Sequence, residues 1–326
     1  MKFDIIEIDR VCDGAKKKGN NPFYPEHSGV SSDFGKNTHH ISDANFIDIH
    51  YHADPDAYLR RHGAIAAGQL YGEFGGWVVL KNHLGCTAAQ ATEARRAGAP
   101  VSGSVVLNEI VGGIDRRVIE RSLCQSDTGN GRLIVHLPTV TGRAHKSRLA
   151  RDLRHSILRD GDRAIQPLTI SDDTGRLLPQ VMDILRLACD APIVVSSGHA
   201  SRGEVYRLID AALALNVPRL MLNQPANPLT GLSAHDLGEI SQASGVFIEQ
   251  CALTYLLGYQ DDADFFAVLR DVRNVIYSSD LGQPSQPDIG EWIDLTRIWF
   301  GRAGLSHGRI DDITRNNPLR MLELPS

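Results

Sequence analysis

An α/β fold is predicted for this chain of 326 residues, and two observations lead to that prediction. Eight short apolar runs rich in β-branched residues recur along the sequence, and segments with helical periodicity lie between them. No strand is followed by Gly-x-Gly-x-x-Gly, the dinucleotide-binding turn of many doubly wound sheets. Eight strands that each lead into a helical segment are typical of a (β/α)8 TIM-type barrel, which the sequence therefore favours.

The predicted elements follow one another regularly. Strands are expected at residues 46–49, 77–80, 104–107, 133–135, 193–196, 219–222, 246–248 and 275–278. Helical periodicity is found at residues 87–99, 115–126, 177–190, 202–216, 233–244 and 261–274. Residues 136–192 break the spacing with a basic stretch and then a small hairpin, whose turn is predicted at residues 172–175. We expect this insertion after the fourth strand to cover the barrel mouth.

Two regions are predicted along the chain. Residues 1–44 are expected to be an irregular N-terminal segment that wraps the barrel, and residues 45–326 are expected to form a single (β/α)8 barrel. The length of the chain lies within the range of one large α/β barrel, so no second domain is required.

Composition and charge exclude several classes of protein. Hydrophobic residues at 42% and charged residues at 22% are ordinary for a globular protein with a large core. The formal net charge of -5 offers no basic surface for nucleic acid. Without a run of ~20 apolar residues or a signal-peptide pattern, we expect no membrane partner and a cytoplasmic location. Five scattered cysteines without Cys-x-x-Cys spacing indicate reduced thiols.

Polar residues follow every predicted strand. Chemistry in such barrels lies at the carboxyl ends of the strands, so these positions are the informative ones. In chain order they include His50 and His52, Lys81 and His83, Asn108, His136, His199, Asn223, Glu249 and Asp280. Any single one is more often an ordinary loop residue, but a whole ring of them indicates a functional site.

The first strand ends in a His-x-His pair. Residues two apart on an extended backbone point the same way, so His50 and His52 can aim at one point, although the pattern also arises by chance. Imidazole and carboxylate are the usual ligands of a divalent ion such as zinc, and His199 and Asp280 would complete such a set. Asp280 could also take a proton from the metal's water, whose pKa the ion lowers to about 7.

Three motifs carry a family resemblance. "IDIHYHADP", "SSGHAS" and "SSDLGQP" resemble the strand-one His-x-His, the strand-five His and the strand-eight Asp of the amidohydrolase superfamily of metal-dependent hydrolases. The match is closest to a poorly characterised branch, with "LKNHLGCT", "LNEIVGG", "HLPT" and "NNPLRML" as further landmarks between residues 45 and 322. The resemblance implies that His50, His52 and His199 are metal ligands, and that Asp280 is both a ligand and the proton acceptor.

Two departures from the superfamily pattern bear on the number of metal ions. Asn223-Gln224-Pro225 stands where many members have Thr-His-Pro, and an amide is a poor zinc ligand. His136 stands where binuclear enzymes often use a carboxylated lysine, and it stays a candidate metal ligand. We therefore expect one divalent ion rather than two, with zinc first and manganese or another metal as alternatives. Asn223 is assigned to substrate binding.

Lys81, His83 and Glu249 are assigned to the site with several roles open. Lys81 can polarise a carbonyl, bind a substrate carboxylate, be carboxylated as a metal bridge or pair with an acidic neighbour. Together with Asp280, Lys81 and His83 are the candidate catalytic residues. Glu249 can act in substrate binding, as an additional ligand, or as a hydrogen-bond partner of a ligand histidine.

The loop after the fourth strand indicates the charge of the substrate. Arg143 and His145 are assigned to substrate binding, because an arginine fork matches carboxylate and phosphate groups. The later basic residues have amphipathic spacing and are expected on a solvated helix face. The expected partner is therefore a small, carboxylate-bearing molecule.

Three function classes remain open on the sequence. The first is a metal-dependent hydrolase, whose metal-bound hydroxide attacks a C–N bond of the amide, cyclic amide or imide type, or a related bond. The alternative is a metal-dependent lyase, a decarboxylase or hydratase, that acts on a carboxylated ring or diacid. The third is a non-catalytic barrel that binds a ligand or partner, for which Asn223 is the hint. A homo-oligomer is expected in each case.

Overall fold

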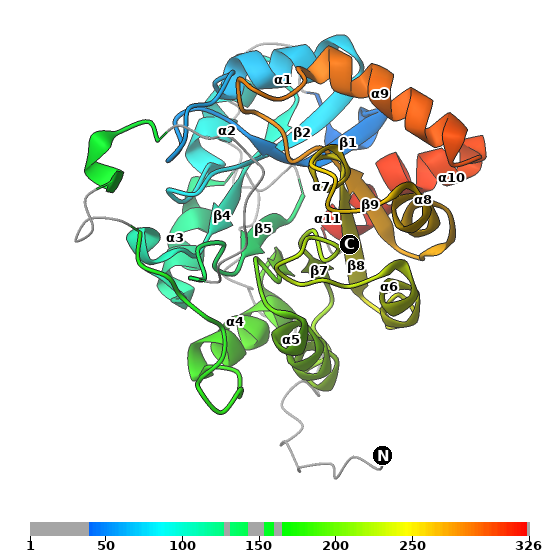
Figure 1. Ribbon diagram of the computed structural model, residues 1–326. Helices are drawn as coiled ribbons and strands as arrows, with labels where there is room; N and C mark the ends of the chain where they lie inside the picture. Colours follow the sequence, from blue (N-terminus) through cyan, green and yellow to red (C-terminus); the bar gives the residue numbers. More distant parts are fainter. Residues whose placement is uncertain (1–38, 127–130, 143–152, 160–164, 325–326) are drawn as a thin grey trace.

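The computed structural model describes residues 39–126, 131–142, 153–159 and 165–324 (Figure 1). Its strands are β1 (Phe46–His52), β2 (Gly76–Lys81), β3 (Val101–Ser102), β4 (Ser104–Val106), β5 (Leu133–His136), β6 (Ile193–Ser196), β7 (Leu220–Leu222), β8 (Val246–Cys251) and β9 (Val275–Ser278). Its helices are α1 (Ala64–Glu73), α2 (Ala88–Arg96), α3 (Arg116–Gln125), α4 (Pro179–Asp190), α5 (Arg202–Ala214), α6 (Ala234–Ile240), α7 (Ala252–Leu256), α8 (Asp262–Asp271), α9 (Ile289–Arg302), α10 (His307–Asp311) and α11 (Asn317–Leu322). Short helical turns are η1 (Ile41–Asp43), η2 (Glu109–Val111), η3 (Ser156–Arg159) and η4 (Asp312–Asn316).

The strands alternate with helices and pair in parallel, which confirms the predicted α/β fold. β1, β2 and β3 form one sheet, and β4 to β9 form a second in chain order. The third predicted strand, at residues 104–107, corresponds to β4, and β3 is an additional short strand that Gly103 separates from it. A Cβ at Gly103 would lie 2.6 Å from the Cα of Ala88, so only glycine lets β4 begin this close to the first turn of α2.

The first and last strands lie side by side (Figure 1). The Asp280 N–H donates to the His50 carbonyl at 2.8 Å, and the His52 N–H donates to the Leu281 carbonyl at 2.9 Å. The residues that follow β9 therefore run along β1. This pairing brings Asp280 beside the two histidines, although about 230 residues separate them in the chain.

One face of the strands carries an apolar layer directly below a polar one. The apolar layer includes Ile47, Ile49, Trp77, Val79, Ile134, Val194, Met221, Phe247 and Ile276, and Met321 and Leu322 of α11 pack against it. Side chains two residues apart in a strand share a face. The positions two residues beyond Val79, Ile134, Met221 and Phe247 are Lys81, His136, Asn223 and Glu249. Strand periodicity thus places four of the predicted site residues in one layer.

A β-bulge in β1 turns the histidine pair toward this layer. The pairing with β2 shifts register between Asp48 and Tyr51, so β1 carries one extra residue there. Asp48 faces the other way and accepts a hydrogen bond from the Tyr71 hydroxyl of α1. Strict alternation would place His50 on the same side as Asp48. The bulge instead brings His50 to the side that carries Ile49.

The six predicted helices correspond to α2, α3, α4, α5, α6 and α8. Several helices begin at capping residues: the side chain of Ser201 caps α5 in a reciprocal box with Glu204, and Asp288 caps α9 with Glu291. α1 and α9 were not predicted and cover the strands on the β1 side (Figure 1). None of the described helices has the length and apolar character that crossing a membrane requires.

The predicted hairpin is reduced to a turn with one bridge. Ser171 and Leu177 form an isolated antiparallel bridge, and the Asp172 N–H donates to the Arg176 carbonyl at 2.9 Å. Arg143 and His145 lie outside the described residues, as do residues 1–38 of the predicted N-terminal segment. The role of the insertion over the site therefore stays a prediction.

Gly198 supports the loop that carries His199. Its φ of +56° is left-handed, and an added Cβ would lie 2.1 Å from the Leu137 carbonyl oxygen. Gly198→Ala is therefore expected to lower the free energy of unfolding by about 2–3 kcal/mol, measured by urea denaturation. Gly304→Ala is the matched control, because Gly304 has a φ of +67° with nothing within 4 Å of the added Cβ. Equal losses in the two variants would show that the contact with Leu137 has no effect.

Candidate metal centre

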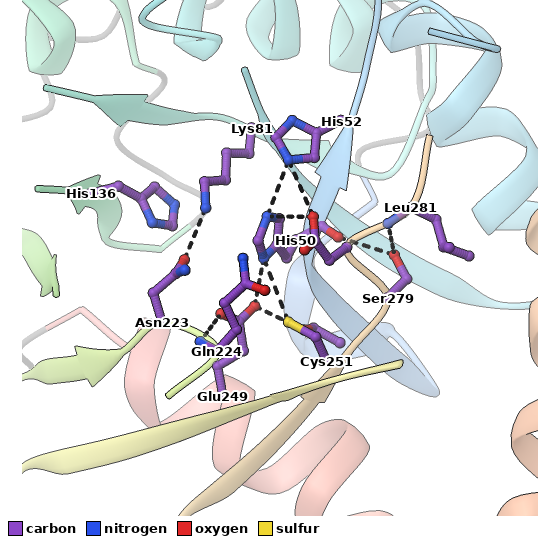
Figure 2. A network of polar contacts seen from close by, with 12 residues as sticks. His50, His52, Lys81, His136, Asn223, Gln224, Glu249, Cys251, Ser279 and Leu281 are labelled. Carbon is purple, nitrogen blue, oxygen red and sulfur yellow. Dashed lines mark hydrogen bonds and ion pairs between the residues drawn. The ribbon is translucent and has the colours of Figure 1, made fainter. Parts of the chain in front are cut away.

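Three potential ligand atoms converge where β1 and the residues after β9 meet (Figure 2). The Nε2 atoms of His50 and His52 lie 3.3 Å apart. Oδ1 of Asp280 lies 3.1 Å from His50 Nε2 and 3.3 Å from His52 Nε2. All three side chains are buried. Ligands of a tetrahedral zinc ion, each about 2.0–2.1 Å from the metal, are about 3.3 Å apart, so this triangle has the dimensions of one face of a zinc site.

Cys251 lies on the other side of the His50 ring. His50, Asp280 and Cys251 form a buried group that can hold a metal ion. The Cys251 Sγ, however, is 3.9 Å from His50 Nδ1 and 3.3 Å from the Ser278 hydroxyl oxygen. Burial raises the pKa of the Cys251 thiol well above its usual value, which disfavours the thiolate that binds metals. The histidine pair with Asp280 is therefore the better ligand set.

Glu249 orients the first histidine. Its Oε1 atom lies 2.8 Å from His50 Nδ1 and also accepts a hydrogen bond from the Ser278 hydroxyl at 2.8 Å. Its Oε2 accepts from the Gln224 N–H at 2.9 Å. A carboxylate on Nδ1 fixes the tautomer that leaves the Nε2 lone pair for a metal. Of the roles open for Glu249, these contacts favour the hydrogen-bond partner of a ligand histidine.

The electrostatics of the centre favour a cation. Burial opposes a charge on His50, but the carboxylates of Asp280 and Glu249 outweigh this effect and raise its pKa to about 9. Burial alone would raise the pKa of Asp280, yet the contact with His50 holds it well below its usual range. Burial and the nearby Arg60 guanidinium lower the pKa of His52 to about 3, so this ring stays neutral.

Asp56 organises a second group beside the first. Its carboxylate accepts from the His83 and Ala57 N–H groups at 2.7 Å each and from Arg60 Nε at 2.8 Å, and it lies 3.1 Å from His83 Nδ1. His52, Asp56 and His83 are close enough to hold a metal. The Arg60 guanidinium already supplies a positive charge to this carboxylate, so we assign the group a structural role. The His83 ring stacks on that of His52 with centroids 4.8 Å apart.

The remaining predicted residues lie around the triangle rather than in it. Lys81 Nζ donates to Asn223 Oδ1 at 2.9 Å, and His136 Nδ1 lies 2.9 Å from the Ser196 hydroxyl oxygen. His199 Nε2 is 3.3 Å from the Gln224 side-chain nitrogen. Burial lowers the pKa of both His136 and His199 well below the usual value, so both rings are neutral. Asn108 Oδ1 accepts a hydrogen bond from the Thr139 N–H at 2.8 Å and so stabilises the loop after β5.

A cavity of about 300 Å³ opens onto the centre. Its polar lining residues include His52, Lys81, His83, His199 and Asp280, and its apolar lining residues include Leu229, Leu253 and Leu257. Cavities of this size are at the lower end of the range for small-molecule sites. The centre is therefore accessible to a small molecule.

Several residues of the site were missed by the sequence reasoning. Asp56, Arg60, Ser278 and Gln224 are buried and contact the predicted residues, and Thr254 lines the cavity. The Ala-Asp-Pro-Asp sequence after His52 was the available signal for Asp56. The backbone of Gln224 is left-handed, with a φ of +37°, as is that of Asp280 at +54°. Such conformations cluster at functional sites, but a sequence does not reveal them.

Removal of the Glu249 charge tests its orienting role. Glu249→Gln is nearly isosteric, and it is expected to weaken zinc binding by about 10- to 100-fold, since outer-shell partners of ligand histidines have effects of that size. Zinc affinity can be measured by competition with a chromogenic chelator. Glu239→Gln on α6 is the control and should bind zinc like the parent protein. An unchanged affinity in Glu249→Gln would contradict the orienting role.

The fold and the site define an α/β protein with a buried histidine–aspartate centre that can hold a metal ion. Residues 45–249 match a family of unknown function, DUF6282, and the chain belongs to that family. The matched region contains both histidines of the triangle, whereas Asp280 lies beyond it. No curated protein matches this sequence.

Proposed function

We propose that this protein is a metal-dependent hydrolase of the amidohydrolase type, built on a closed (β/α)8 barrel. Support for the closed barrel comes from the hydrogen bonds that join the residues after β9 to β1. The apolar cluster with side chains from seven of the nine described strands also supports it, because strands around a barrel share one interior. The metal centre then lies at the carboxyl ends of the strands, where barrel enzymes have their active sites.

The triangle of His50, His52 and Asp280 is the observation that carries this proposal. Its sides of 3.1–3.3 Å fit a zinc ion, and each member comes from a strand end that the fold brings together. Three protein ligands leave one coordination position open, as in catalytic rather than structural zinc sites. We propose a single ion, because the Arg60 guanidinium occupies the neighbouring carboxylate of Asp56.

The residues around the centre have different roles in the proposed reaction. A bound zinc ion would supply Lewis acidity and lower the pKa of a water to about 7. Asp280 lies at the edge of the cavity, where its second oxygen can accept a proton from an attacking water. Glu249 holds the His50 ring in place through its contact with Nδ1. We propose a C–N bond of a small amide, cyclic amide or imide as the bond that is cleaved.

Metal content tests the proposal most directly. The purified protein is expected to bind about one equivalent of zinc by elemental analysis after reconstitution, and His52→Ala is expected to lose it. His62→Ala is the matched control, because His62 follows β1 as well but pairs with Asp288 at 2.9 Å and lies outside the cavity. If the parent protein took up no zinc or manganese, the proposed function would be wrong.

Reaction products distinguish hydrolysis from other chemistry on the same centre. The zinc-loaded protein should be incubated with a panel of cyclic imides, lactams and aromatic acids. Ring-opened products that are absent with His52→Ala would support hydrolysis. Release of CO₂ from the aromatic acids would replace the hydrolase proposal by a decarboxylase.

A further inference from the structure

A buried cation at the cavity wall has too few partners. Lys81 is 2% exposed and lines the cavity. Within the described part of the chain, its ammonium donates one hydrogen bond, to Asn223 Oδ1 at 2.9 Å. An ammonium has three N–H donors, and a buried charged donor without an acceptor is destabilising. Lys81 therefore has donors available for a ligand that enters the cavity.

Two further polar atoms beside Lys81 have no partner among the described residues. These are Asn223 Nδ2 and His136 Nε2, both buried. Figure 2 shows the His136 ring and the Asn223 amide pointing toward the end of the Lys81 side chain. Asn223 Nδ2 is a donor, and His136 Nε2 carries a proton when the Ser196 hydroxyl donates to Nδ1, which is 2.9 Å away. These two N–H groups and the Lys81 ammonium are three donors close to one point, where an acceptor atom of a ligand can receive their hydrogen bonds.

The charges of the site indicate an anion. With His50 neutral, as a metal ligand is, two basic side chains, Lys81 and Arg60, lie near the three carboxylates of Asp56, Glu249 and Asp280. Burial lowers the pKa of Lys81, and the carboxylates of Glu249 and Asp280 oppose that effect. These five side chains together carry a net charge of -1, from two positive and three negative groups. A divalent ion in the triangle changes this net charge to +1. A buried excess charge is costly unless it is paired, so the loaded site favours a ligand with a single negative charge.

The apolar residues that line the cavity indicate the chemistry of the rest of the ligand. Leu229, Leu253 and Leu257 line the same cavity of about 300 Å³. Apolar surface of this kind stabilises the burial of an apolar group by about 25 cal/mol per Å². The limited volume excludes a large or extended body.

We propose that the site takes a small monocarboxylate with a compact apolar body, and that Lys81 binds the carboxylate together with Asn223 Nδ2 and the Nε2–H group of His136. This inference rests on the proposed function, because the metal ion provides the excess positive charge. It assigns Lys81 to substrate binding. It also makes His136 a hydrogen-bond donor rather than a ligand of a second ion.

Benzoate and its uncharged analogue benzamide are suitable probes, with calorimetric titration of the zinc-loaded protein. Benzoate is expected to bind at least about 10-fold more tightly than benzamide, since hydrogen bonds to charged groups contribute about 1.5–3 kcal/mol. Lys81→Met and Asn223→Asp should each weaken benzoate binding by at least about 10-fold while the zinc content stays at one equivalent. Asn223→Asp preserves the shape of the side chain and gives Lys81 a counterion, so it tests the proposal even if Lys81→Met fails to fold.

Arg186→Met is the matched control for the loss of a positive charge. Arg186 lies on the exposed surface of α4, where it pairs with Asp183 at 2.9 Å, so its replacement should leave benzoate binding unchanged. Equal binding of benzoate and benzamide, unchanged binding in Asn223→Asp, or no binding of benzoate at millimolar concentration would overturn the inference. A second equivalent of zinc that is lost in His136→Gln would also overturn it. Absence of zinc from the parent protein would instead refute the proposed function.

Discussion

Replacement of Asp280 by asparagine is expected to weaken zinc binding by more than about 100-fold, because loss of a ligand should exceed the 10- to 100-fold effect of an outer-shell change. Asp280 is the single carboxylate in the triangle, and its Oδ1 contacts both histidine nitrogens at 3.1–3.3 Å. Asparagine suits this position, because it is one of the few residues other than glycine that tolerates the φ of +54° found here. The change therefore removes charge without a new backbone strain. Zinc affinity is measured by chelator competition at neutral pH.

Asp288→Asn provides the control for this prediction. Asp288 also faces an imidazole, that of His62 at 2.9 Å, and it lies in the same region of the chain. It caps α9, so its replacement is expected to change stability slightly and to leave zinc binding intact. The assignment of Asp280 as a ligand would be untenable if Asp280→Asn and Asp288→Asn bound zinc equally well.

Replacement of Asp56 by alanine is expected to lower the free energy of unfolding by about 3–5 kcal/mol, as when one partner of a buried ion pair is removed. Asp56 is fully buried, and its loss leaves the Arg60 guanidinium and two backbone N–H groups without their acceptor. The pKa of Asp56 supports this strong dependence: burial alone would raise it, but the contacts with His83, His52 and Arg60 hold it well below the usual range. Urea denaturation measures the change, with an unaltered m value as the sign of two-state unfolding.

Two further variants isolate the cause. Asp56→Ala combined with Arg60→Met should recover part of the lost stability, because the unpaired guanidinium is then absent. Asp183→Ala removes an exposed partner of Arg186 on α4 and should leave stability unchanged, as is usual for surface ion pairs. A loss below about 1 kcal/mol in Asp56→Ala would mean that water replaces the carboxylate at this position.

The strands were predictable because their sequence pattern is local. Buried parallel strands are short apolar runs, and each of the eight predicted runs overlaps an observed strand. The short strand β3 before Gly103 was not predicted, and the close approach of Gly103 to Ala88 of α2 depends on tertiary packing. The helices α1 and α9 were not predicted either. The small and apolar residues of α1, such as Ala64, Ala66 and Ala67, show little amphipathic contrast.

The site was predictable in composition but not in geometry. The rule that chemistry follows strand ends selected both histidines of the triangle and Asp280. His136 and His199 were predicted as ligands as well, and the structure places their rings beside Ser196 and Gln224, around the triangle rather than in it. Hydrogen-bond partners come from distant strands, and their identity depends on which side chains share a layer.

The sequence by itself determined the order of the eight predicted strands, six of the helices and the polar residues at the strand ends, because short apolar runs and a helical period of 3.6 residues are local features of the chain. Only the tertiary structure decided which atoms meet. The bulge in β1 turns His50 to the inner side, the residues after β9 pair with β1 to bring Asp280 beside it, and Glu249 arrives from β8. Each of these contacts joins residues far apart in sequence, so each depends on backbone pairing that no local pattern encodes.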